Sequence, residues 1–396
     1  MNYARILDLP RLLAQKSFFL LGPRSTGKSH LVRTQLTGEA LIIDLLRSDN
    51  FMRLSERPGV LEEMVQAGGR NIVVIDEVQK LPVLLDEVHR LIEETGTRFL
   101  LTGSSARKLR QGQANLLAGR ARQANLFPLV SAEIPEFDLV RYLTVGGLPQ
   151  VYGSIEPHEE LDAYVGTYLR EEIQAEGAVR DLPRFSRFLS IAALTTGEVL
   201  NFTNVARDVG MSPSTVIEHY RILEDTLVGF MVEPWGRGTR RKEVAAAKFY
   251  LFDTGVTNTL ARIRTLERNS NHFGRAFEQF IALELRAALS YQRVSAPLNY
   301  WRTQDRNEVD FVIGDLCAVE VKATERTSDA DSASLRRLRD EATIGSYYLV
   351  SQDPIERLKG GVRYLPWRRF LERLWSGELL GDKDSGSSPG ASAPST

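Results

Sequence analysis

Eight residues near the start of the chain, GPRSTGKS at positions 22–29, constrain its fold more than any other segment. They match the pattern G-x-x-x-x-G-K-[ST] in full, with the apolar run FFLL (18–21) before them and a helical pattern from His30 after them. Glycines let such a loop curl so that its backbone N–H groups face phosphates, and the following helix adds its positive N-terminal end. The sequence therefore predicts a triphosphate-binding loop between a buried strand and a helix.

Each residue of this loop has an expected contact. Lys28 is predicted to reach the β- and γ-phosphates, and the Ser29 hydroxyl to join the shell of a Mg²⁺ ion. The predicted nucleotide contacts are Gly22, Pro23, Arg24, Ser25, Thr26, Gly27, Lys28, Ser29 and His30. ATP and Mg²⁺ are accordingly the expected ligands.

Two later apolar runs end in polar residues that suit the same site. The run IVVI (72–75) is followed by Asp76, predicted to hold Mg²⁺ through its water shell, and Glu77, predicted to polarise the attacking water. The run FLL (99–101) is followed by hydroxyl residues, of which Thr102 or Ser104 is a candidate sensor of the γ-phosphate. The alternative role for these hydroxyls is an N-cap of the next helix.

A basic pair further along is a candidate for a third catalytic group, beside Lys28 and Glu77. Arg120, preferred over Arg122, is a cation that would reach the γ-phosphate bound to a neighbouring copy of the chain. The alternative is an ordinary surface arginine pair.

The first part of the chain is predicted to be α/β. Its four continuous apolar runs, at 18–21, 41–43, 72–75 and 99–101, are typical of parallel strands buried on both faces. The segments between the runs are long enough for crossover helices.

The order of these motifs resembles an AAA+ type P-loop ATPase. The phosphate loop, the DE strand, the TGSS strand and the LAGR and FPL segments are similar to one family of uncharacterised bacterial and archaeal ATPases with a C-terminal domain of unknown function. The segments GLP (147–149), YLREE (168–172), FDTG (252–255) and GRAFE (274–278) also resemble that family. The resemblance implies ATP binding and ring assembly, and no known substrate.

A central segment resembles a winged helix-turn-helix. Two helical patterns, at 202–209 and 213–223, flank the turn Gly210-Met211-Ser212, and a strand pattern follows at 227–235. The second helix carries acidic residues that suit DNA phosphates poorly, whereas the run RGTRRK (237–242) is a candidate basic wing. DNA contact and a purely protein-contacting role both stay open.

A C-terminal pair of strand patterns, 307–313 and 317–322, places carboxylates and a lysine together. Glu320 and Lys322 share a face, and a three-residue loop would set Asp310 opposite Glu320, whereas a two-residue loop would not. A divalent metal would hold both carboxylates, Lys322 would align or deprotonate a water, and Glu278 on the preceding helix would complete the shell.

This arrangement resembles the PD-(D/E)xK nuclease fold, with Val309 where the motif's name expects proline. Two alternatives remain: a charged hairpin face in water, and a nuclease fold kept for binding or assembly without catalysis. The histidines 89, 158, 219 and 272 stand apart in sequence and are expected at the surface.

Composition limits the remaining classes. With 50 Lys and Arg against 51 Asp and Glu, the net charge of −1 excludes a chain that coats nucleic acid by bulk charge. One cysteine, Cys317, excludes a disulfide framework and fits a reducing, cytoplasmic compartment, and no apolar run approaches the roughly 20 residues of a membrane span.

The expected organisation follows from these segments. The parts are a P-loop core over 1–128, a helical lid over 129–178, a winged helix-turn-helix region over 179–245, a nuclease-like α/β domain over 246–378 and a disordered tail over 379–396. The expected protein is a homo-oligomeric ATPase that couples nucleotide state to the nuclease-like domain, with DNA as a candidate partner. The alternative is a nucleotide-gated binding or signalling switch whose nuclease fold is silent.

Overall fold

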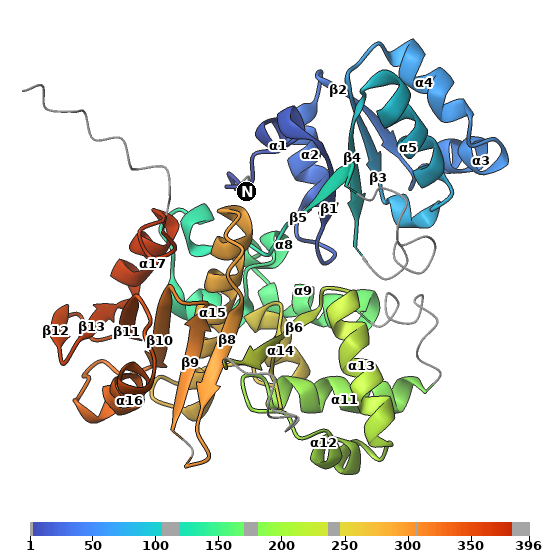
Figure 1. Cartoon of the computed structure of the whole chain (residues 1–396). Coiled ribbons are helices and arrows are strands. Elements are labelled where there is room, and N and C mark those ends of the chain that lie inside the picture. Colours follow the sequence, from blue (N-terminus) through green and yellow to red (C-terminus); the bar gives the residue numbers. More distant parts are fainter. Residues whose placement is uncertain (1–2, 105–118, 170–180, 237–245, 306, 382–396) are drawn as a thin grey trace, which may run out of the picture. The chain divides into compact units, whose positions relative to one another are not determined.

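A computed structural model of the chain describes residues 3–104, 119–169, 181–236, 246–305 and 307–381 (Figure 1). The chain divides into two compact units, Met1–Pro234 with Gly238–Tyr291, and Trp235–Arg237 with Gln292–Thr396. Residues 246–291, expected in the C-terminal domain, therefore cluster with the first unit.

The first unit begins with a five-stranded parallel sheet in the order β2-β3-β4-β1-β5. Its strands are β1 (Ser17–Leu21), β2 (Ala40–Asp44), β3 (Ile72–Asp76), β4 (Arg98–Gly103) and β5 (Ala121–Asn125). The four predicted strands lie within β1 to β4. Because β4 sits between β1 and β3, the carboxyl ends of these three strands meet at one edge of the sheet.

Helices cover both faces of this sheet, because side chains of successive strand residues point to opposite faces. Val74, Leu100 and Leu20 belong to one buried cluster, with α1 (Leu9–Gln15) and α2 (Lys28–Leu36). The neighbouring strand residues belong to the other cluster, with α3 (Ser48–Glu56), α4 (Val60–Gly68) and α5 (Leu84–Thr95) (Figure 1). The predicted α/β fold of this part is confirmed.

The rest of the first unit is mostly helical. Its helices are α7 (Leu139–Val145), α8 (Pro149–Tyr152), α9 (Pro157–Ala163), the π-helix η3 (Tyr164–Leu169), α11 (Leu182–Leu194), α12 (Phe202–Val209), α13 (Pro213–Asp225), α14 (Thr254–Leu260) and α15 (Asn271–Tyr291). The strands β6 (Gly229–Pro234) and β7 (Lys248–Leu251) pair antiparallel.

The predicted helix-turn-helix lies in α12 and α13. Gly210, at φ 76°, ends α12 in the left-handed region that glycine tolerates. The Ser212 hydroxyl caps α13 by accepting from Thr215 N at 3.2 Å. The candidate basic wing, 237–242, lies outside the described residues, as do residues 170–172 of the YLREE segment.

His219 on α13 corrects one expectation. It is buried between the rings of Phe185 and Phe188, and burial lowers the pKa of its imidazole. The local sequence around His219 does not predict this burial, because the two phenylalanines lie more than thirty positions earlier.

The second unit holds a mixed sheet in the order β12-β13-β11-β10-β9-β8. Its strands are β8 (Leu298–Arg302), β9 (Glu308–Ile313), β10 (Cys317–Lys322), β11 (Ser346–Ser351), β12 (Arg357–Lys359) and β13 (Val362–Pro366). The helix α16 (Ala333–Glu341) connects the parallel pair β10 and β11, and α17 (Trp367–Trp375) follows β13.

The start of the predicted disordered tail is buried. Leu379 and Leu380 were expected in that tail but are buried, and residues 382–396 lie outside the described part of the chain. Among the helices described, none is long and apolar enough to cross a membrane.

Candidate nucleotide site

The predicted loop joins β1 to α2, and its backbone shape requires glycine at two positions. Gly27, at φ 92°, is left-handed and precedes the first residue of α2, Lys28. A Cβ on Gly22 would lie 2.3 Å from the Leu126 carbonyl oxygen, so any side chain there would displace backbone. The motif glycines thus serve close approach and a left-handed turn.

The positive charge of the loop, on Lys28, is buried among carbonyl oxygens of the loop itself. Lys28 is only 6% exposed, and its Nζ donates to the carbonyl oxygens of Gly22 at 2.7 Å and Pro23 at 3.0 Å. The Thr26 hydroxyl also donates to Pro23 O at 2.9 Å. Phosphate oxygens would therefore bind Lys28 by replacing these carbonyls around an ammonium already in place.

Oxygen side chains from three elements meet beside the loop. The Ser29 hydroxyl donates to Asp76 Oδ2 at 2.7 Å, and the Thr102 hydroxyl donates to Asp76 Oδ1. Asp76 is 4% exposed. Carboxylate and hydroxyl oxygens are the ligands that Mg²⁺ prefers, so Ser29 and Asp76 suit the metal predicted for them.

Glu77 follows at the end of β3 with a left-handed backbone, at φ 61°. Its N–H donates to the Thr102 hydroxyl at 3.0 Å, and its carboxylate accepts from Gln79 Nε2. Ser104 is 2% exposed, and its Oγ lies 3.3 Å from the same Nε2. The structure therefore brings Lys28, Ser29, Asp76, Glu77, Thr102 and Ser104 together at one sheet edge.

Arg120 lies elsewhere in the chain's own fold. It directly precedes β5, whose first residue pairs with Ser17 at the start of β1, so it sits at the amino ends of the strands. There it forms an ion pair with Glu93, near the end of α5. Within one chain Arg120 thus occupies the sheet edge opposite the phosphate loop.

Family comparison assigns the domain that holds this site. Residues 14–135 match the family described as "AAA domain". Residues 14–135, which are similar to that family, are referred to as the AAA-type domain. Two further families match the following segments, each described as a domain of unknown function: DUF8612 over 136–267 and DUF4143 over 273–370.

Three uncharacterised bacterial proteins are similar to this chain. An uncharacterised protein of Mycobacterium bovis and one of Mycobacterium tuberculosis are each 26% identical over 320 residues, 78% of this chain and 70% of the relative. An uncharacterised protein of Haemophilus influenzae is 21% identical over 248 residues, 57% of this chain and 60% of the relative.

One solved structure shows a distant likeness. The replication initiator DnaA, bound to AMPPCP and single-stranded DNA, aligns with 54% of this chain and 85% of its own at 14% identity and a TM-score of 0.30.

Sequence reasoning missed a buried arginine behind the AAA-type loop. Arg5 donates to Thr26 O at 2.8 Å and to Phe127 O at 2.6 Å. Its Nε lies 2.9 Å from Glu133 Oε2, with side chains 5% and 0% exposed. The sequence offers no signal for this, because a lone arginine at position 5 resembles any surface residue.

The GLP and FDTG segments meet each other close to the AAA-type domain. Asp253, fully buried, accepts hydrogen bonds from Gly147 N at 2.7 Å and Val256 N at 3.0 Å. Burial raises the pKa of its carboxyl to about 6. The neighbouring Pro149 Cγ would lie 4.0 Å from a Cβ on Gly27, which places the start of α8 beside the phosphate loop.

The C-terminal hairpin has the longer of the two loops that the sequence left open. Cys317 pairs with Ile313, so the hairpin loop has three residues, the length that sets Asp310 opposite Glu320. Both carboxylates are buried, at 8% and 5% exposure. Asp310 Oδ2 accepts from Val321 N at 2.8 Å, and Lys322 Nζ lies 2.6 Å from Glu320 Oε1.

Glu278 has its own partners in the first unit. Its Oε1 accepts from the Tyr250 hydroxyl at 2.6 Å and from Lys248 Nζ at 3.3 Å. In the part of the chain that the structure describes, no three His, Cys, Asp or Glu side chains form a group suited to a metal ion.

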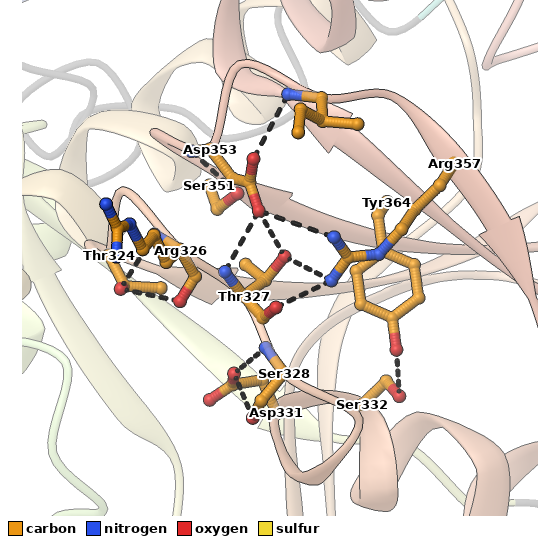
Figure 2. Close-up of polar contacts among 11 residues, drawn as sticks. Thr324, Arg326, Thr327, Ser328, Asp331, Ser332, Ser351, Asp353, Arg357 and Tyr364 are labelled. Atoms are coloured by element: carbon orange, nitrogen blue, oxygen red, sulfur yellow. Dashed lines mark hydrogen bonds and ion pairs between the residues drawn. The ribbon is translucent and has the colours of Figure 1, made fainter.

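The segment after Lys322 is fixed by a polar network (Figure 2). Asp353 Oδ2 accepts from the N–H and the hydroxyl of Thr327 at 2.9 and 2.8 Å, and Arg357 Nη2 donates to Thr327 O at 2.7 Å. Burial alone would raise the pKa of the Asp353 carboxyl, but the hydrogen bonds from Thr327 lower it below its ordinary value. The network thereby joins the segments that follow β10 and β11.

Proposed function

We propose that the AAA-type domain binds and hydrolyses ATP in a Mg²⁺-dependent reaction. The observation that carries the proposal is the hydrogen bond of 2.7 Å between Ser29 and Asp76, beside the buried Lys28. It joins a hydroxyl from the loop helix to a carboxylate from a neighbouring strand. That pair of oxygens next to a buried cation suits a metal-bound triphosphate.

Each residue then has one task. Lys28 exchanges the Gly22 and Pro23 carbonyls for β- and γ-phosphate oxygens, and Ser29 and Asp76 would hold Mg²⁺, which when bound neutralises charge on the phosphates. Glu77 accepts the proton of the attacking water. Thr102 and Ser104 lie at the same edge and supply hydroxyls near the γ-phosphate.

Two variants test this reaction. Lys28→Ala is expected to lose ATP binding in isothermal titration, and Glu77→Gln to bind ATP while releasing no phosphate. The exposed Lys359→Ala and Glu94→Gln are matched controls that should behave as wild type. Hydrolysis by Glu77→Gln at the wild-type rate would refute its role as base, and unchanged binding by Lys28→Ala would refute the site.

For the C-terminal unit we favour a nucleotide-gated binding role with a silent nuclease-like cluster. Lys322 is engaged by Glu320, one oxygen of Asp310 is engaged by Val321 N–H, and Glu278 is engaged by Tyr250. A cleaving site would need these groups for metal and water. Glu278, expected to complete the metal shell, is bound by Tyr250 and Lys248 instead, which supports binding or assembly over cleavage.

An ATP-driven DNA-processing nuclease is the competing function. It predicts Mg²⁺- or Mn²⁺-dependent cleavage of single- or double-stranded DNA that disappears in Asp310→Ala and Lys322→Ala. We expect no such cleavage by the wild-type chain with or without ATP. Cleavage that both variants abolish would replace the silent assignment with an active nuclease.

A further inference from the structure

A glutamine that the sequence analysis did not single out lies between the expected base and the expected sensor. Gln79 belongs to the short 3-10 helix η1 (Val78–Lys80), directly after Glu77. Its Nε2 donates to Glu77 Oε2 and lies 3.3 Å from Ser104 Oγ. The side chain is only 9% exposed, so these contacts are shielded from water.

The orientation of the Gln79 amide is set by its partner. A carboxylate offers only acceptors, so the amide nitrogen must face Glu77 and the oxygen must face away. Oε1 then points at Gly103, where a Cβ would lie only 2.8 Å away. In the described part of the chain this buried Oε1 accepts no hydrogen bond.

A buried carbonyl oxygen with no donor costs free energy. A leucine at position 79 would avoid that cost, because it has a similar volume and no polar side-chain atoms. The contact to Glu77 is therefore the feature that accounts for an amide here. Unexplained polar groups of this kind concentrate where a structure holds reacting groups in place.

We propose that Gln79 is a positioning residue for ATP hydrolysis, which fixes the carboxylate of Glu77 and links it to Ser104. The inference rests on the proposed ATPase activity. Gln79 binds one carboxylate oxygen of Glu77 and leaves the other to accept the water proton. Because Ser104 contacts the same amide, a phosphate that moves the Ser104 hydroxyl also moves the base.

The decisive variant is Gln79→Leu, which keeps the volume and removes the amide. We expect kcat to fall on the order of 10- to 100-fold, because a base displaced by about 1 Å loses that much. ATP affinity and KM should stay within about twofold, since Gln79 contacts no loop residue that binds phosphate. Gln66→Leu, an exposed glutamine that contacts Glu62 on α4, is the matched control.

Two more variants test the geometry. Gly103→Ala leaves Gln79 in the chain but places a methyl group against its Oε1, so it should lower kcat in the same way. Ser104→Ala combined with Gln79→Leu should cost less than the product of the two single effects, because both residues act through one contact.

The outcomes separate this inference from the proposed function. Wild-type turnover with an unchanged kcat in Gln79→Leu overturns the positioning role alone. Loss of ATP binding and of the melting transition in Gln79→Leu and Gly103→Ala also overturns it, in favour of a structural role. If the wild-type chain shows no Lys28-dependent hydrolysis, the proposed ATPase activity fails, and this inference fails with it.

Discussion

Arg5 shows how one buried side chain can hold a loop in shape. Its guanidinium binds two carbonyl oxygens, of Thr26 in the loop and Phe127 after β5, while Glu133 supplies the opposite charge. Since all three partners are distant in sequence, the arginine links the N-terminal segment to both sides of the phosphate loop. The loop's conformation therefore depends on a residue outside its motif.

Replacing this arginine should destabilise the protein strongly. Arg5→Met leaves Glu133 buried without its cation, and breaking a buried pair this way typically costs about 3–5 kcal/mol of unfolding free energy. Urea denaturation of the two chains measures the difference. Arg122→Met is the control, because Arg122 is exposed, and its effect should stay within about 0.5 kcal/mol. Equal losses in the two variants would show that the buried ion pair of Arg5 with Glu133 does not stabilise the fold.

Asp253 gives a prediction in the pH dependence of stability. Burial raises the pKa of its carboxyl to about 6 in the folded chain, against 3.8 when unfolded. Between these values the folded state binds more protons than the unfolded state, so the free energy of unfolding falls as pH rises. The contribution of Asp253 is complete below about pH 3.8, is lost as pH rises through about 6, and amounts to about 3 kcal/mol.

Asp253→Asn stays neutral and should lack this contribution. Denaturation gives the unfolding free energy of wild type and variant at pH 4 and at pH 7. The pH dependence of the wild type minus that of the variant is the contribution of Asp253. The exposed Asp208→Asn should keep the wild-type slope. A wild-type slope in Asp253→Asn as well would mean that this carboxyl is not the titrating group.

At the scale of elements, local patterns were enough to predict four strands of the first sheet. Continuous apolar runs identified β1 to β4 because strands covered on both faces admit few polar residues. For β9 and β10 the sequence left a two-residue and a three-residue loop open, and the structure has the three-residue loop before Cys317. Of these features, only the apolar runs could be predicted from neighbours in sequence.

Other parts of the site depend on distant neighbours and could not be predicted. Arg5 pairs with Glu133, and Asp253 accepts from Gly147, each through a contact between residues more than a hundred positions apart. Glu278 was expected beside Asp310, yet its helix belongs to the first unit and its carboxylate is bound there. Helical periodicity places a residue on a face but does not say what that face meets.

The close approach of Gly22 to Leu126, where β1 turns into the phosphate loop, leads to a testable prediction. In Gly22→Ala the new Cβ would overlap the Leu126 carbonyl, and Leu126 is itself held to Leu21 by a hydrogen bond of 2.7 Å. We expect β5 to be forced from β1, with a loss of about 1–3 kcal/mol in unfolding free energy and weaker ATP binding. Calorimetry and ATP titration measure both.

A matched glycine controls for the loss of backbone freedom. Gly59, before α4, has helical backbone angles and no neighbour within 4 Å of an added Cβ. Gly59→Ala should therefore leave stability and ATP binding unchanged or slightly improved. Similar losses in the two variants would rule out the overlap with Leu126 as the cause.

For the whole molecule, the position of Arg120 bears on whether one chain supplies every residue of the expected ATPase site. The phosphate loop lies at the carboxyl edge of the sheet, whereas Arg120 lies at the amino edge, with its side chain 37% exposed beside Glu93. An arginine there reaches a γ-phosphate only if a second chain presents it. The expected ring would thus place the arginine of one chain at the loop of the next.

A mixing experiment tests this arrangement. Arg120→Ala should bind ATP normally and hydrolyse it poorly, because its site lacks the neighbour's cation, and an arginine of this kind is worth about 10³-fold or more in rate. Glu77→Gln should be inactive for the opposite reason, since it keeps Arg120 and lacks the base. In a mixture, a Glu77→Gln chain presents its intact Arg120 to an Arg120→Ala chain, so phosphate release should recover although each variant alone is inactive.

The control mixture combines Arg120→Ala with the double variant Glu77→Gln/Arg120→Ala. It should restore no phosphate release, because neither chain carries Arg120. Full activity of Arg120→Ala alone would instead make the arginine a surface residue paired with Glu93, and a mixture without recovery would confine each active site to a single chain.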